Sequence, residues 1–187
     1  AGEKRVGGWT DVPVSEEGIA QAKAWGRFFV RIPLTAAYCS DLARSRQTAD
    51  IICAGRKVPV RAMAKLREIN LGVLENVPMR AFREQFPQKW RERGERIFSF
   101  EPEGGESFRM LLARVLPVYD EICAKAPESV LVVGHAGVNR VLLCHLLGMP
   151  PQNLFRIGQD CACLNRIDCR NIPHRVVAMN CPPPADA

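Results

Sequence analysis

The sequence predicts an α/β protein, a three-layer sandwich in which helices cover both faces of a mostly parallel central sheet. Two observations favour this class. Short apolar runs of strand length alternate along the chain with longer segments whose apolar residues recur at helical spacing. The last two apolar runs are hairpin-like, which predicts a mixed edge on the sheet. Neither a repeat nor a convincing linker divides the chain, so residues 1–187 are expected to form one domain.

The N-terminal part of the chain predicts two helices and two strands. Ser15 is a good N-cap followed by two acidic residues, so a helix is expected from about Glu16 to Val30. Leu34 to Cys39 is short and apolar, which predicts a buried strand. A second helix is expected over about Leu42 to Ala54, and Val58 to Ala62 is a weaker strand candidate.

The middle of the chain predicts helices outside the sheet and one long helix against it. Val77 to Phe100 is polar, aromatic and rich in arginine, which is typical of helical excursions over a sheet. Ser107 is expected to cap a long amphipathic helix, in which Pro117 predicts a kink or an interrupted hydrogen bond. The apolar stripe of this helix consists of Phe108, Leu111, Leu112, Val115, Val118 and Ile122.

The C-terminal part predicts three strands and one helix. Ser129 to Val133 is a short apolar run, and a helix is expected from about Val138 to Leu147, before a glycine and a proline that stop it. Cys161 to Asp168 and Arg175 to Asn180 are the two terminal strands.

The composition favours a small anionic partner. Hydrophobic residues make up 47% and charged residues 25% of the chain, which are ordinary globular values. The net charge is +6, but the chain has no long Lys/Arg block and no interleaving of aromatic with basic residues, so a small anion is preferred over nucleic acid. No apolar run reaches the length of a membrane span and no secretory signal is visible. A cytoplasmic protein without membrane partners is therefore expected.

The eight cysteines do not show a metal-binding spacing. There is no CxxC pair, so the sequence does not predict a zinc site. Cys161 and Cys163 are two residues apart and would share one face of a strand, but a metal or redox role for them is the minor alternative. A reduced protein is the default for a chain of this length.

Polar side chains follow two of the expected strands. Arg44 comes soon after the strand that ends at Cys39, and His135 directly after the strand that ends at Val133, where a helix begins. Because the carboxyl ends of parallel strands gather at one edge of a sheet, these side chains can share a pocket, which Glu68 in a loop could overhang. A helix start beside His135 also favours an anion. Of the other histidines, His145 is expected to be a packed or rim residue, and His174 a surface residue.

These segments resemble those of the histidine phosphatase superfamily, which includes the cofactor-dependent phosphoglycerate mutases. Arg44 matches the arginine after the second strand of the family, Glu68 its proton-donating carboxylate and His135 its second active-site histidine. The Gly104-Gly105-Glu106-Ser107 run resembles the turn before the long helix of the family. The resemblance covers nearly the whole chain and implies a phosphoglycerate mutase-like fold.

One departure from the family concerns the nucleophile. Members begin with a strand that ends in an Arg-His-Gly motif, whose histidine accepts the phosphoryl group. That motif is not in this sequence, whose histidines are His135, His145 and His174. By the spacing of the family, the first strand and its histidine are expected to lie before residue 1. Asn76, where many relatives carry glycine, is a lesser departure.

The resemblance implies phosphoryl transfer through a phosphohistidine. Arg44 would grip the phosphate oxygens, His135 would stabilise the transferring oxygens, and Glu68 would protonate the leaving group and later activate water. Four further residues are candidate substrate contacts. The backbones of Gly7 and Gly8 could approach phosphate, although a plain turn is the simpler interpretation. Arg46 could contact the substrate, but a position on the surface is equally consistent with the sequence. The amide of Ala136 lies at the expected start of a helix and could donate to phosphate. No metal or cofactor is implied, because arginine and histidine already supply positive charge.

The predicted activity is hydrolysis of a small phosphorylated metabolite, with α-ribazole 5′-phosphate as one candidate substrate. The short segment Asn76 to Pro102 favours a phosphatase, because mutases of this kind usually carry a larger insertion there. Two alternatives stay open: a cofactor-dependent phosphoglycerate mutase, and a non-catalytic phosphate-binding module without the nucleophile. The expected partner is a small phosphorylated substrate, and a homodimer is left open.

Overall fold

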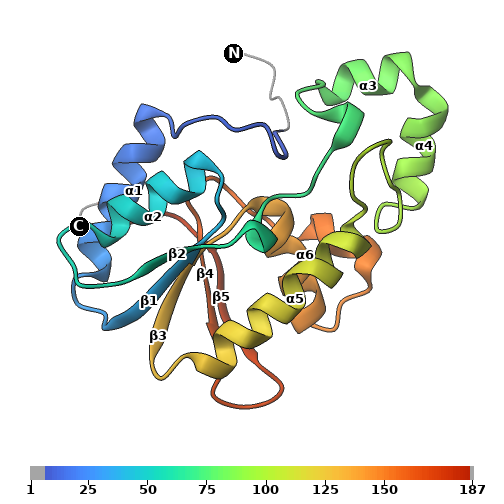
Figure 1. The fold of residues 1–187 in the computed structure, drawn as a ribbon. Coiled ribbons are helices and arrows are strands. Elements are labelled where there is room, and N and C mark those ends of the chain that lie inside the picture. Colours follow the sequence, from blue (N-terminus) through green and yellow to red (C-terminus); the bar gives the residue numbers. More distant parts are fainter. Residues whose placement is uncertain (1–6, 186–187) are drawn as a thin grey trace.

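The computed structural model describes residues 7–185 and contains a parallel sheet of three strands and an antiparallel hairpin of two. The strands β1 (Leu34–Cys39), β2 (Val60–Ala62) and β3 (Ser129–Val133) lie in the order β2-β1-β3 (Figure 1). The strands β4 (Leu164–Asp168) and β5 (Arg175–Cys181) form the hairpin. The predicted α/β class with a mostly parallel sheet is confirmed. The two terminal strands form the expected hairpin, but among the described residues they make a sheet of their own and not a mixed edge of the parallel sheet.

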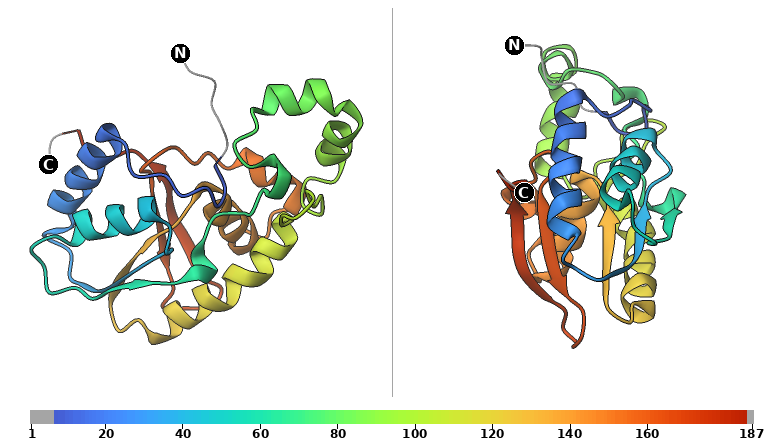
Figure 2. Two further views of the ribbon diagram at one scale, coloured as in Figure 1. Left: turned by 45° about the horizontal axis from the view of Figure 1, so that its top comes forward. Right: turned by 90° about the vertical axis from the view of Figure 1, so that its left-hand side faces the viewer.

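Helices cover both faces of the parallel sheet (Figures 1 and 2). The helices α1 (Glu16–Phe29) and α2 (Ala43–Cys53) pack on one face, and α5 (Phe108–Lys125) and α6 (Ala136–Leu146) on the other. Side chains alternate along each strand. Ala37 of β1 therefore joins the buried cluster under α1 and α2, whereas its neighbours Ala36 and Tyr38 join the cluster under α5 and α6.

Local sequence signals explain where two of these helices begin. The Ser15 hydroxyl accepts a hydrogen bond from the Gly18 amide, 3.2 Å away, and the Ser107 hydroxyl accepts one from Met110 at 3.3 Å. The helix α5 continues through Pro117, where the sequence predicted an interruption. The buried side chains on both sides of the proline pack against the sheet and stabilise one continuous helix. These side chains are Leu111, Val115, Val118 and Ile122.

The predicted excursion consists of α3 (Met79–Gln85) and α4 (Pro87–Glu95), which project beyond the sheet (Figure 2). Phe82 is buried between Phe86 and Trp90, with ring centroids about 6 Å apart in both pairs. This small aromatic core holds the two helices together. The described part of the chain also contains three 3₁₀ turns: η1 (Ala64–Leu66), η2 (Gly72–Leu74) and η3 (Pro151–Arg156).

Two strand edges face each other without pairing. Within residues 7–185, β3 pairs with β1 alone and β4 with β5 alone. The right-hand view of Figure 2 shows the hairpin on the β3 side of the parallel sheet. Val133 and Leu164 contribute to the same apolar cluster, and Val132 is 42% exposed although strands of a parallel sheet are normally covered on both faces. The backbone groups along these edges are available to a further strand.

Candidate active site

The site lies at the carboxyl ends of β1 and β3, where two serines join the strands. Ser40, fully buried, follows β1, and its Oγ lies 2.7 Å from Nε2 of His135, which follows β3. Ser45 at the start of α2 accepts a hydrogen bond from the Ser40 amide at 3.0 Å and donates one to the Val133 carbonyl at 2.8 Å. These bonds fix the end of β1, the start of α2 and the end of β3 relative to one another.

His135 is the N-cap of α6 and is only 9% exposed. Burial lowers the pKa of its imidazole to about 3, and the positive charges of Arg44 and Arg114 add to this effect. The imidazole is therefore neutral at pH 7. A neutral imidazole carries one N–H donor and one acceptor nitrogen. It can therefore donate a hydrogen bond to a phosphate oxygen in place of its contact with Ser40.

Glu68 is also buried and faces the start of α6. Its carboxylate accepts hydrogen bonds from the Gly137 amide at 2.9 Å and from the Ile69 amide at 2.8 Å. Burial raises the pKa of Glu68, and these two bonds and the charge of Arg44 offset part of that rise. A Cβ atom on Gly137 would lie 2.3 Å from Oε1 of Glu68, so only glycine allows this approach. The raised pKa suits a general acid at neutral pH.

Arg44, in the first turn of α2, connects the site to the N-terminal segment. Its Nη1 donates to the Thr10 carbonyl at 2.9 Å and its Nη2 to the Gly8 carbonyl at 2.7 Å. Two of the five N–H donors of the guanidinium are used in this way. The Trp9 indole, in the segment that Arg44 holds, donates to the Glu68 carbonyl at 2.7 Å, and the Glu68 carboxylate accepts from Gly137, two residues after His135. The structure therefore brings together the three side chains that the sequence singled out.

The four candidate substrate contacts lie at different distances from this centre. Gly8 is buried and bonded to Arg44, and a Cβ there would lie 2.1 Å from Oε1 of Glu75, so it is tightly enclosed. Gly7 is exposed with open space around it, and Arg46 is exposed on the side of α2 away from Arg44. Ala136 is half-buried at the first position of α6, next to His135.

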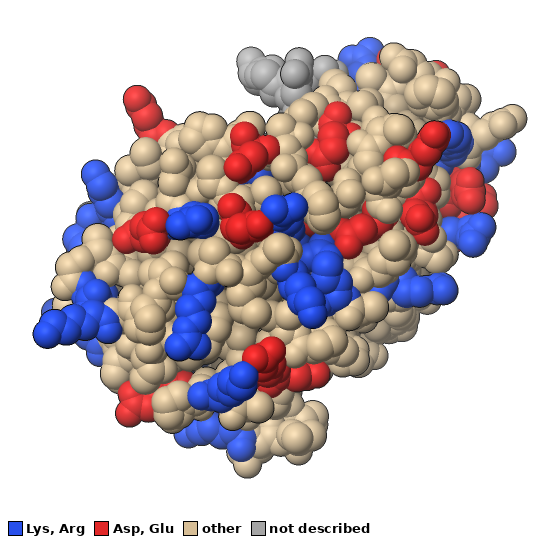
Figure 3. Space-filling model, in the orientation of Figure 1, with Lys and Arg blue, Asp and Glu red and all other residues tan. Residues whose placement is uncertain are grey.

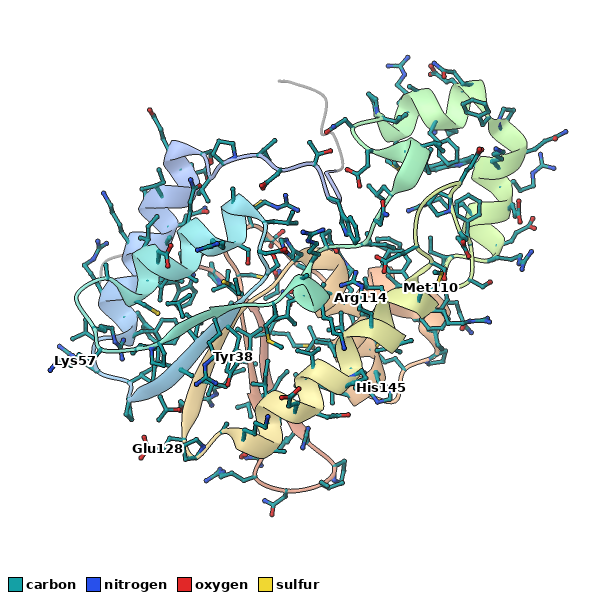
Figure 4. All side chains as sticks on the ribbon, viewed as in Figure 1. Tyr38, Lys57, Met110, Arg114, Glu128 and His145 are labelled. Atoms are coloured by element: carbon teal, nitrogen blue, oxygen red, sulfur yellow. The ribbon has the colours of Figure 1, made fainter. Side chains whose placement is uncertain are left out.

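Sequence reasoning missed the residues that hold the loops of the site. Arg114 of α5, labelled in Figure 4, donates to the carbonyls of Lys65, Arg67 and Glu68 at 2.8 to 3.2 Å. It also forms a salt bridge of 2.8 Å with Glu106. These contacts fix the backbone that carries Glu68. The stripe of α5 predicted a buried face, but no local signal pairs Arg114 with a loop so far away in the chain.

Charges on the molecular surface are mixed. Basic and acidic side chains are interspersed on the face displayed in Figure 3. No helix among the described residues combines the length and apolar character that crossing a bilayer requires. Of the described residues, one group of three His, Cys, Asp or Glu side chains lies close enough together to hold a metal ion, and it shares no residue with the candidate active site.

The sequence and the fold are similar to those of several known proteins. The sequence profile of the histidine phosphatase superfamily, branch 1, matches residues 1–182. An adenosylcobalamin/α-ribazole phosphatase of Salmonella typhimurium is 30% identical over 157 residues, which cover 82% of this chain and 78% of that protein. A 2,3-bisphosphoglycerate-dependent phosphoglycerate mutase of Gloeobacter violaceus is 30% identical over 165 residues, covering 83% and 74%. A mycobacterial glucosyl-3-phosphoglycerate phosphatase matches in structure with a TM-score of 0.82, 27% identity and coverage of 95% and 92%.

Proposed function

The chain belongs to the histidine phosphatase superfamily, and from this premise we propose that the protein is a phosphomonoesterase that hydrolyses a small phosphorylated metabolite through a phosphohistidine intermediate. The observation that carries the proposal is the set of hydrogen bonds that gathers Arg44, Glu68 and His135 at one edge of the sheet. Phosphoryl transfer needs a positive charge, a hydrogen-bond donor and a general acid. The guanidinium supplies the charge, the neutral imidazole is the donor, and the carboxyl group of raised pKa is the acid.

The nucleophile in this proposal is the histidine of an Arg-His-Gly motif on a strand outside the 187 residues. The unpaired edges of β3 and β4 support this assignment, since a parallel strand between them would bring its carboxyl end beside His135. In the first step, the nucleophilic nitrogen bonds to phosphorus, the ester bond breaks, and Glu68 gives its proton to the leaving oxygen. In the second, Glu68 takes a proton from water while the water oxygen bonds to phosphorus. The phosphorus–nitrogen bond breaks in this step, which frees the histidine and releases phosphate.

Arg44 and His135 act on the phosphoryl group in both steps. The N–H donors of Arg44 that do not bond to Gly8 and Thr10 neutralise its oxygens, and the imidazole of His135 donates a hydrogen bond as charge builds up. Because the guanidinium is already held by two carbonyls, little ordering is required on binding.

The choice of substrate rests on similarity to known proteins and on the length of one segment of the chain. α-Ribazole 5′-phosphate is the first substrate to test, because a relative is named for that activity. The alternative is a phosphoglycerate mutase, which is favoured by the similarity to the Gloeobacter protein. The short segment between Asn76 and Pro102 favours the phosphatase. We expect the enzyme to act in the cytoplasm, with its cysteines reduced.

The test compares two products. Full-length protein is incubated with α-ribazole 5′-phosphate or with 3-phosphoglycerate, with and without bisphosphoglycerate, and release of phosphate is compared with isomerisation. Phosphate release with an acid-labile phosphoenzyme supports the proposal. Isomerisation that depends on bisphosphoglycerate would favour the mutase, and binding of vanadate without turnover by full-length protein would favour a non-catalytic module.

The role of Glu68 has its own test within this assay. Glu68→Gln is expected to slow alkyl phosphates by about 100-fold or more, but nitrophenyl phosphate much less, because a good leaving group needs no acid. The exposed Glu101→Gln is the matched control and should not change either rate. Equal slowing of both substrates would remove Glu68 from the role of proton donor.

A further inference from the structure

A cluster of soft metal-binding side chains lies at the edge of the sheet opposite the candidate active site. Cys123 is near the C-terminal end of α5, which leads into the amino end of β3. Cys169 directly follows β4 and His174 directly precedes β5, so both belong to the connection of the terminal hairpin. This connection therefore lies against the end of α5.

The contacts in the cluster are short. The Sγ atoms of Cys123 and Cys169 are 2.7 Å apart. One possible ligand atom from each of Cys123, Cys169 and His174 lies within 4.8 Å of the other two, and all three residues are half-buried. The hydroxyl of Tyr119, one helical turn before Cys123, lies 3.4 Å from Sγ of Cys169 and 2.8 Å from Nδ1 of His174.

We propose that Cys123, Cys169 and His174 bind one Zn²⁺ ion, with water at the fourth coordination position. Two thiolates and one imidazole form a ligand set that zinc uses in proteins, and the two negative charges balance the ion. In a tetrahedral site with Zn–S bonds of about 2.3 Å, two sulfurs lie roughly 3.8 Å apart. Binding therefore requires the sulfurs to separate by about 1 Å, which side-chain rotation at the half-buried site allows.

Tyr119 acts as a positioning residue for this site. Tyr119 is buried, and its hydroxyl contacts both Cys169 and His174. A hydroxyl bonded to one ring nitrogen of a histidine fixes the ring orientation, as groups behind metal ligands commonly do. The imidazole also packs edge-on against the ring of Tyr119, with centroids 5.6 Å apart. The ring that Tyr119 holds in this way has one nitrogen within 4.8 Å of both sulfurs.

Zinc binds cysteines as thiolates, so the ion takes the place of the two thiol protons when it binds. The bound ion would tie the terminal hairpin to α5. Because the site lies at the far edge of the sheet from His135, zinc would stabilise the fold without taking part in phosphoryl transfer.

The test uses Co²⁺ as a spectroscopic probe and Zn²⁺ itself. Reduced wild-type protein titrated with Co²⁺ should develop a thiolate-to-cobalt charge-transfer band that saturates at one equivalent, and Zn²⁺ should abolish that band. Zn²⁺ should also raise the thermal unfolding temperature. Cys169→Ser and His174→Gln should weaken metal binding at least tenfold, whereas Cys161→Ser, which changes an exposed cysteine, should bind as the wild type does.

Two results would overturn the proposal. One is a folded, fully reduced wild-type protein that gives no charge-transfer band at one equivalent of Co²⁺. The other is a Cys123–Cys169 disulfide, found by mass spectrometry of non-reduced peptides, that forms in preference to metal binding when Zn²⁺ is present. Circular dichroism confirms that each variant is folded, and the wild-type titration alone decides the outcome if a variant does not fold.

Discussion

The neutral imidazole of His135 makes the stability of the folded protein depend on pH. Burial, with the charges of Arg44 and Arg114, lowers its pKa from 6.5 to about 3. Between these values the unfolded chain binds more protons than the folded one, so this histidine lowers stability as the pH falls from about 6.5 toward 3. We expect His135→Gln to reduce the slope of unfolding free energy against pH by up to about 1.4 kcal/mol per unit.

The measurement is urea unfolding of both proteins at several pH values between 4 and 7. The control is His145→Gln, which removes an exposed histidine near the other end of α6, labelled in Figure 4. Identical slopes for wild type and His135→Gln would show that the imidazole is not held neutral by the fold.

Gly137 allows the carboxylate of Glu68 to reach the start of α6. An added Cβ would lie 2.3 Å from Oε1 and 3.1 Å from Cδ of Glu68, so Gly137→Ala must displace the carboxyl group. We expect a loss of about 1–3 kcal/mol in stability from overpacking. We also expect turnover of alkyl phosphates to fall at least tenfold, because the acid leaves its position.

Gly94→Ala is the matched control for this substitution. Gly94 lies in α4, where nothing is within 4 Å of an added Cβ, so alanine should stabilise that helix by about 0.5–1 kcal/mol and leave turnover unchanged. Thermal unfolding and steady-state kinetics of the two variants give the comparison. Wild-type turnover in Gly137→Ala would contradict the proposed role of the Glu68 position.

At the scale of elements, Glu75 holds the N-terminal segment against the loop after η1. Its carboxylate accepts from the amides of Gly8, Trp9, Thr10 and Leu71 and from the Thr10 hydroxyl, at 2.8 to 3.2 Å. Burial raises the pKa of Glu75, but the hydrogen bonds lower it overall. A carboxyl with a lowered pKa stabilises the fold above its unfolded value of 4.5, and this contribution is lost as the pH falls through the folded pKa.

Glu75→Gln should therefore cost about 2–4 kcal/mol at pH 7, because an amide presents a donor to backbone N–H groups that need an acceptor. The difference from wild type should shrink below pH 4.5. Since Gly8 and Thr10 hold Arg44, phosphate or vanadate affinity should fall as well. Urea unfolding and isothermal titration test both effects against Glu95→Gln, an exposed residue of α4. A variant with wild-type stability and affinity would contradict this role.

The elements themselves were largely predictable. The strands at Leu34–Cys39 and Ser129–Val133 have the expected bounds, and the helices α1, α2 and α5 begin or end within one residue of expectation where Ser15, Leu42 and Ser107 precede them. These signals are local: apolar period, caps and breakers. The β4 strand begins three residues later than expected, because Ala162 adopts a positive φ of 54° that a strand does not allow.

At the scale of the whole molecule, the sequence predicted which residues approach the site but not what holds them. Arg44, Glu68 and His135 could be placed together because the ends of parallel strands meet. The contacts of Glu75 and the cluster of Cys123, Cys169 and His174 could not, because each joins segments far apart in the chain. Cys123 and Cys169, for example, are 46 positions apart. His174, expected at the surface, is half-buried against Tyr119 for the same reason, since the hairpin docks on α5.

The division of the strands into two groups supports one more prediction about the whole molecule. Within residues 7–185, β1 is paired on both sides, whereas β3 offers one edge to no partner. The hydrogen of a backbone amide without a hydrogen-bond partner exchanges with solvent through local fluctuations. The hydrogen of a paired amide exchanges only when a larger part of the structure unfolds. In a preparation of these 187 residues alone, β1 amides should therefore exchange slowest, and the β3 amides that point away from β1 much faster.

If a histidine-bearing strand pairs with β3 and β4, as the proposed mechanism requires, full-length protein should protect those same β3 amides at least tenfold more strongly. The amides of α3 and α4, which project away from the sheet, should exchange equally in both preparations and serve as the internal control (Figure 2). Hydrogen exchange followed by mass spectrometry measures all of these segments at once. Unchanged exchange at β3 in a full-length protein that hydrolyses phosphate esters would mean that the nucleophile reaches the site by another route than a strand of this sheet.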